Sequence, residues 1–166
     1  MNGLNSLSPS YLRTFVFGVE DSLVSTVGLL SGIALTELSV KHIVLTGMVL
    51  IFVEAFSMAA GSFLSEHSAK EYREQREMPL GGSLVSGSIM FFSYFLSGFI
   101  PLFPYIIFPV ANAFWISILL SLAVLFGLGI FGARLSKTGF IRGGLRMFFV
   151  GGIAIAVGVA VGSMLS

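Results

Sequence analysis

The sequence predicts an all-α integral membrane protein with five transmembrane helices. Of its 166 residues, 55% are apolar and only 10% are charged, whereas about a quarter of the residues are charged in an ordinary soluble domain. Five apolar runs are each long enough to supply the ~20 residues with which a helix crosses a bilayer. This composition excludes a disordered chain, a nucleic-acid binder and an ordinary soluble enzyme. It leaves room for a single membrane domain over residues 1–166.

The predicted spans are, in chain order, about 13–36, 42–65, 83–108, 112–133 and 144–165. The first contains acids, but it has neither the basic flank nor the cleavage site of a signal peptide, so we expect it to be a span. The second and fourth are clean apolar runs. The third is long and ends in prolines, and the fifth is rich in glycine, which is common in membrane helices. Residues 65–82 predict a helical extension of the second span that ends in a turn.

Basic residues are unequally divided between the two ends of these spans. One end receives eight: Arg13, Lys70, Arg73, Arg76, Arg134, Lys137, Arg142 and Arg146. The opposite end receives only Lys41. Because cytoplasmic loops carry the excess of Lys and Arg, this division predicts cytoplasmic loops at 66–82 and 134–143. The N-terminus is then cytoplasmic and the C-terminus is external or lumenal.

Three acids, Glu20, Asp21 and Glu54, lie inside predicted spans with no Lys or Arg in the same apolar stretch. Intramembrane acids usually face a bundle interior, a partner or an ion path. Counted from the cytoplasmic edge, Asp21 and Met58 are each seven residues deep, which is ~10 Å at 1.5 Å per residue. The same count puts Ser25 level with Glu54. We therefore expect Asp21 beside Met58.

Helical spacing agrees with this pairing. The stripe on the first span is Asp21, Ser25, Gly28 and Gly32, and the stripe on the second is Glu54, Met58, Gly61 and Ser65. A carboxylate beside a thioether suits a first-row transition ion better than Ca²⁺ or Mg²⁺, and an acid in low dielectric can exchange a cation for a proton. The alternative is that serine and backbone groups satisfy the acids and that Met58 fills the core.

Four segments resemble the vacuolar iron transporter family: GVEDSLVSTVGLLSGIA (18–34), EAFSMAAGSFLSEHSAKEY (54–72), SGFIPLFPYII (97–107) and GLRMFFVGGIAIAVGVAVGSML (144–165). The resemblance implies a five-helix protomer that forms a homodimer, with the ion path between the two first helices. It also implies export of Fe²⁺, and often Mn²⁺, from the cytoplasm in exchange for H⁺. Asp21 and Met58 match the positions that line the family's membrane metal site, whereas Glu54 has no such match.

The chain departs from plant and protist members, which insert a Glu-rich cytoplasmic metal-binding domain where this sequence has only residues 66–82. In that short loop His67, Glu71, Glu74 and Met78 are spaced as one helical face. The face is either a weak metal-capture surface or an ordinary solvated helix with i,i+4 ion pairs. Accessory site residues are these four, together with Glu20 and Ser25.

The leading hypothesis is an exporter of Fe²⁺ and/or Mn²⁺ that acts by H⁺ antiport, with the metal as substrate and no tightly bound cofactor. The alternative is a non-transporting scaffold or regulatory subunit. No enzyme is expected, because an aspartyl mechanism needs two facing carboxylates and the depth count separates Asp21 from Glu54 by one turn. The expected partners are lipid, a second copy at a two-fold axis near Gly28 and Gly32, and divalent metals. The expected location is a prokaryotic cell membrane, or a vacuolar-type membrane in a eukaryote.

Overall fold

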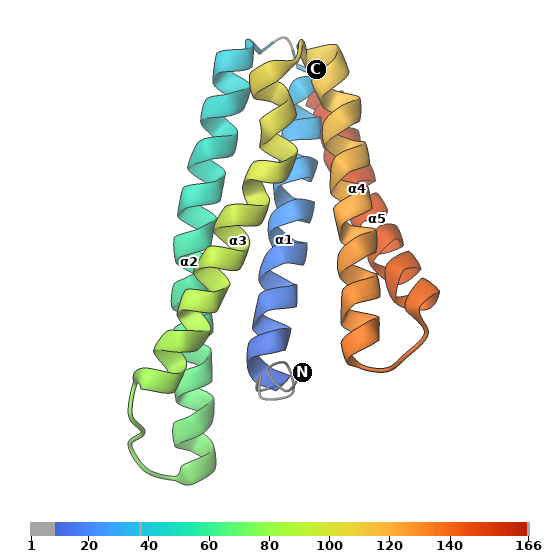
Figure 1. The fold of residues 1–166 in the computed structure, drawn as a ribbon. Helices are drawn as coiled ribbons and strands as arrows, with labels where there is room; N and C mark the ends of the chain where they lie inside the picture. Colours follow the sequence, from blue (N-terminus) through green and yellow to red (C-terminus); the bar gives the residue numbers. More distant parts are fainter. Residues whose placement is uncertain (1–8, 37, 166) are drawn as a thin grey trace.

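The structure is a computed structural model that describes residues 9–36 and 38–165. Within these residues five helices are long and apolar enough to cross a membrane, and no strand occurs. They are α1 (Pro9–Ala34), α2 (Val40–Glu74), α3 (Gly81–Ile107), α4 (Val110–Leu135) and α5 (Phe140–Leu165) (Figure 1). The predicted all-α class with five spanning helices is confirmed.

At the end of the bundle where α1 begins, α1 and α5 start at Pro9 and Phe140, each about one turn before the predicted spans of about 13–36 and 144–165. The predicted helical extension of the second span is confirmed: α2 continues past its apolar run to Glu74 and projects beyond the other helices (Figure 1). It ends where Gln75 adopts a left-handed conformation with φ 52°. Helix α5 begins at Phe140, so the predicted 134–143 loop shrinks to residues 136–139. Both differences arise because a helix does not stop where its apolar run stops.

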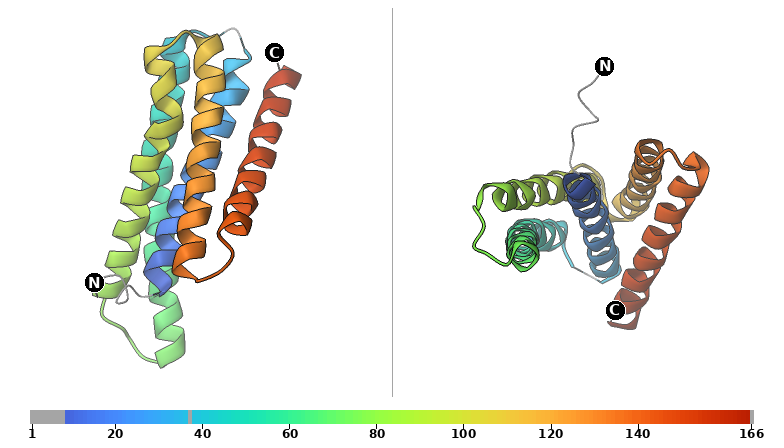
Figure 2. Two further views of the ribbon diagram at one scale, coloured as in Figure 1. Left: turned by 45° about the vertical axis from the view of Figure 1, so that its right-hand side comes forward. Right: turned by 90° about the horizontal axis from the view of Figure 1, so that it is seen from below.

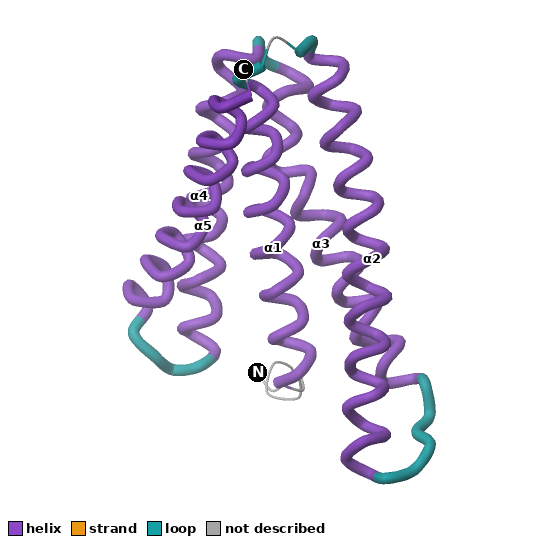
Figure 3. Tube along the Cα trace, turned by 180° about the vertical axis from the view of Figure 1, so that it is seen from behind, coloured by secondary structure: helices purple, strands orange, loops and turns teal. Residues whose placement is uncertain are grey.

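Helix α1 lies between two helix pairs, α2 with α3 and α4 with α5 (Figure 1). The pairs come together at the α3–α4 connection and spread apart towards the end that holds the N-terminus, as the rear view also shows (Figure 3). Seen along the bundle, α5 is tilted strongly against the other helices (Figure 2). The first half of α1 is therefore flanked by the two pairs without being enclosed by them, and Phe17 there is 47% exposed.

The core lies where the pairs meet, and its buried cluster is Leu30, Ile43, Ile51, Leu102, Tyr105 and Ala113. Apart from two tyrosines, Tyr94 and Tyr105, every buried polar residue that the structure describes is Ser or Thr. Such small hydroxyl side chains allow membrane helices to approach closely. The outer surface is apolar, with Phe56 72% and Leu119 65% exposed, as a lipid-facing surface requires.

The glycine stripe of α1 packs against α5 of the same protomer. A Cβ built on Gly32 would lie 2.8 Å from the carbonyl oxygen of Gly158, and one on Gly28 would lie 3.6 Å from that of Ala154. The expectation that Gly28 and Gly32 face a two-fold axis is therefore wrong. Matching glycines on α5 let the two backbones touch, and this contact fills the stripe.

Candidate metal site

The register of α1, α2 and α3 can be followed from hydroxyl contacts. Ser86 Oγ lies 3.3 Å from Thr14 Oγ1 and 3.2 Å from Ser62 Oγ, so these three residues share one level. Further along the bundle, Gly98 of α3 lies between Ser22 of α1 and Ile51 of α2. A Cβ built on Gly98 would lie 2.9 Å from Ser22 Oγ and 2.8 Å from Ile51 Cγ1. Asp21 precedes Ser22 directly, so it is level with the part of α2 just after Ile51.

Glu54, rather than Met58, therefore lies at the level of Asp21, and their carboxyl groups are close enough for their charges to interact. Met58 is four residues from Glu54, about 6 Å along the helix axis, and it shares a cavity with Phe17. The expected levels of Asp21 with Met58 and of Ser25 with Glu54 are wrong by about one turn. The depth count treated α1 and α2 as directly adjacent antiparallel helices, whereas each packs mainly on α3.

Tyr94 of α3 lies near both acids and contacts two serines of α1. Its side chain is fully buried, and its hydroxyl lies 2.8 Å from Ser25 Oγ. Ser22 Oγ donates to the Tyr94 carbonyl oxygen over 2.6 Å. The charges of Asp21 and Glu54 both act on the Tyr94 hydroxyl. The polar centre of the protomer thus consists of two acids, the two serines and Tyr94. The sequence analysis identified the acids and Ser25 but missed Ser22 and Tyr94.

Basic partners for these acids are absent from the part of the chain that the structure describes. All the ion pairs there join residues of the 66–76 segment, such as Lys70 Nζ with Glu66 Oε1 at 3.3 Å. Glu20 interacts with the charge of its neighbour Asp21 and is half-buried. The site is therefore rich in negative charge, which suits a cation.

A cavity of about 610 Å³ opens one turn from the acids, towards the end where α1 begins. Its lining combines two thioethers with hydroxyls and one cation: Arg13, Thr14, Phe17, Ser57, Met58, Gly61, Ser62, Ser65 and Met90. Met90 is only 4% exposed and was not predicted. The sequence signal that could have found Met90 is weak, since a methionine in an apolar span is usually core.

The predicted accessory face on α2 is only partly formed. His67 Nε2 lies 3.2 Å from Glu71 Oε1, while Glu74 lies 3.8 Å from Arg76 Nη2. Met78 does not share this helical face, because the left-handed Gln75 ends the helix before it. Among the described residues, no three His, Asp or Glu side chains gather as a metal cluster. The contacts favour an ordinary solvated helix.

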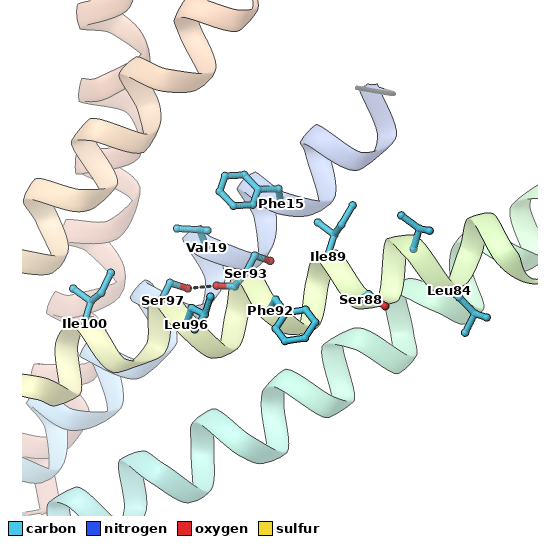
Figure 4. Close-up of a pocket in the computed structure, with 11 residues that line it drawn as sticks. Phe15, Val19, Leu84, Ser88, Ile89, Phe92, Ser93, Leu96, Ser97 and Ile100 are labelled. Atoms are coloured by element: carbon cyan, nitrogen blue, oxygen red, sulfur yellow. Dashed lines mark hydrogen bonds between the residues drawn. The ribbon is translucent and has the colours of Figure 1, made fainter. Parts of the chain in front are cut away.

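A larger groove of about 690 Å³ lies between α1 and α3 (Figure 4). Phe15 and Val19 of α1 face a row of side chains from α3, among which only serines are polar. One of these, Ser97, donates to the carbonyl oxygen of Ser93. The groove holds no charged group and is suited to lipid rather than to an ion.

The fold and its centre define an integral membrane protein with paired acids inside a helical bundle. The model of the VIT family matches residues 12–81 and 75–163, and the chain belongs to this family. Vacuolar iron transporter homolog 2 of Arabidopsis thaliana is 29% identical over 159 residues, which cover 89% of this chain and 80% of that protein. Vacuolar iron transporter homolog 3 of the same plant is 36% identical over 75 residues, which cover 45% of this chain and 38% of that protein.

Proposed function

We propose that this protein transports a divalent transition metal, Fe²⁺ and/or Mn²⁺, across a membrane in exchange for protons. Membership of the VIT family supports the proposal, as do relatives whose names describe them as vacuolar iron transporter homologs. The observation that carries it is the level pairing of Asp21 with Glu54, two acids inside the bundle without a basic partner. Charged side chains inside a membrane domain are costly and usually mark an ion path.

In the proposed path, the ion first enters the cavity that holds the thioethers of Met58 and Met90. Thioethers favour softer transition ions over Mg²⁺ and Ca²⁺, so this cavity would select the metal. The ion then advances about 6 Å, one helical turn, to Asp21 and Glu54. A carboxylate can hold either the metal or a proton, and this alternation couples the two fluxes.

The proposed direction is export from the cytoplasm. The structure brings the eight basic residues to one end of the bundle and Lys41 to the other. The positive-inside rule assigns the basic end to the cytoplasm, and the thioether cavity opens towards that end. The C-terminus is then external or lumenal. The membrane is a prokaryotic cell membrane or, in a eukaryote, a vacuolar one.

We further propose a homodimer in which α1 faces its copy. The glycine stripe is already covered by α5, so the partner would cover the face of α1 that bears Phe17, Glu20 and Asp21. Phe17 is 47% exposed, and the half-buried acids would otherwise meet lipid at high cost. The ion path would then run between the two copies of α1.

Metal uptake into proteoliposomes tests the function directly. The wild type should take up Fe²⁺ and Mn²⁺ faster when a pH gradient is imposed, and metal addition should move protons the other way. Asp21→Asn keeps the shape of the side chain but cannot titrate, so both fluxes should stop. Glu77→Gln is the matched control, because it removes an exposed acid that lies beyond the end of α2. A wild type that moves no metal under either condition would favour a scaffold or regulatory subunit instead.

A further inference from the structure

A second polar cavity, of about 420 Å³, lies at the turn between α4 and α5. It is formed at the basic end of the bundle, far along the chain from the acids. Its polar side chains come from Ser136, Thr138, Arg142 and Arg146. Its volume falls within the range of about 300–1,000 Å³ that is typical of small-molecule sites.

The charge of this turn is entirely positive. Residues 134–146 contain four basic side chains, and no Asp or Glu follows Glu77 anywhere in the sequence. In the described residues the ion pairs belong to the 66–76 segment alone. Arg134 instead lies over the ring of Phe140, 5.7 Å from its centroid. Arg142 and Arg146 therefore face the cavity without a carboxylate to neutralise them.

The backbone of the turn is held by its own hydrogen bonds. The last carbonyl oxygens of α4 accept hydrogen bonds from the turn, with Ser136 N bonded to Gly132 O at 3.0 Å and Thr138 N to Ala133 O at 2.9 Å. These bonds fix the turn that carries Ser136 and Thr138. Gly129 and Gly143 let α4 and α5 touch at the base of the turn, which fixes the helix ends that carry the polar groups.

Exposed apolar side chains alternate with the two arginines along the start of α5. Phe140 is 51%, Ile141 70% and Leu145 42% exposed. Arginines beside exposed apolar side chains match the head group and upper acyl chains of a lipid. Basic pockets between membrane helices on the cytoplasmic side are suited to anionic head groups.

We propose that this cavity binds the phosphate group of an anionic phospholipid, with Arg142 and Arg146 as the principal contacts. The two arginines are four residues apart on α5, so they lie on one face, one turn from each other. Arginine suits this role because its planar fork donates two hydrogen bonds to one phosphate. Ser136 supplies a further hydroxyl donor, while the Thr138 hydroxyl donates to the carbonyl oxygen of Ala133 and holds the turn.

Native mass spectrometry of the full chain in neutral detergent measures the dissociation constants for phosphatidylglycerol and phosphatidylcholine. The wild type should prefer phosphatidylglycerol. The double variant R142Q/R146Q should bind it about 30-fold more weakly, since each arginine near an anionic lipid contributes about fivefold. The control R73Q/R76Q removes the same charge from the other basic turn and should bind as the wild type does. Equal losses in both variants would show diffuse attraction and overturn the site.

Two further measurements keep the test decisive. R142K/R146K preserves charge but not the arginine fork, so it should bind phosphatidylglycerol more weakly than the wild type even where the glutamine variant does not fold. Lysine variants that bind as tightly as arginine would overturn the proposed contacts. Inorganic phosphate should not compete with the lipid; competition that depends on Arg142 and Arg146 would assign the cavity to a soluble phosphate compound and overturn the lipid.

Discussion

Replacing Gly32 by alanine should separate α1 from α5. The Cβ of alanine would lie 2.8 Å from the carbonyl oxygen of Gly158, which is closer than ordinary van der Waals contact. The obstacle is helix backbone and cannot rotate away, so α5 must move. At Gly28, one turn earlier, the same Cβ would lie 3.6 Å from the nearest oxygen. Gly28 is therefore the matched control on the same stripe.

The expected magnitude follows from two opposing effects. Overpacking costs about 1–3 kcal/mol, while alanine in place of glycine favours a helix by about 0.5–1 kcal/mol. Gly32→Ala should then lose about 1–2 kcal/mol of unfolding free energy, whereas Gly28→Ala should be neutral or gain up to about 1 kcal/mol. In a chain of this size each 1 kcal/mol shifts the Tm by about 2–4 °C. The two variants should differ by about 4–8 °C.

Thermal unfolding of the purified protein in detergent measures this difference. Gly127→Ala serves as a second control, because a Cβ there meets no atom within 4 Å. If Gly32→Ala is as stable as Gly28→Ala, the two helices do not touch at this point. The glycine stripe would then be free to face a second protomer.

Three other predictions concern the proposed path. Glu54→Gln should slow transport by about 10- to 100-fold, since a contact with a charged group contributes about 1.5–3 kcal/mol; an unchanged metal uptake rate would exclude Glu54 from the site. Met58→Leu and Met90→Leu should each lower the uptake rate of Fe²⁺ relative to Mg²⁺, and equal losses for both ions would refute selection by thioethers. Phe17→Cys should form a disulfide between protomers, while Gly32→Cys should not. The reverse result would show that the dimer axis lies at the glycine stripe and not at Phe17.

The sequence predicted the class and the number of spans because a bilayer leaves few choices. A backbone in lipid must satisfy its own hydrogen bonds, so a long apolar run must be a helix. The helical extension of the second span was predicted as well, and α2 continues to Glu74, where ion pairs such as Lys70 with Glu66 support it. The residue at which α2 ends was not predicted. Gln75 adopts a left-handed conformation, so Met78, which periodicity assigned to the same face, falls beyond the end of the helix.

Which residues are neighbours across helices was harder to predict. Asp21 and Glu54 could be identified as unusual from their position alone, but their register depends on α3, against which both of their helices pack. Tyr94 was missed for the same reason, although a tyrosine flanked by Ser93 and Ser97 in an apolar span is a usable signal. Its partner Ser25 lies 69 residues away in the chain, and no local pattern indicates that contact.

The observed register changes how the proposed path can discriminate between ions. Asp21 and Glu54 at one level would hold almost any divalent cation, because carboxylates are hard ligands that suit Mg²⁺ and Ca²⁺ as well. Selectivity must therefore be exercised elsewhere, and Met58 and Met90 lie one turn nearer the basic end, where a cytoplasmic ion would arrive first. In the proposed path, selection and proton coupling would thus fall at different levels of the protomer. Changes at the thioethers should then alter which ion passes, and changes at the acids should alter whether any ion passes.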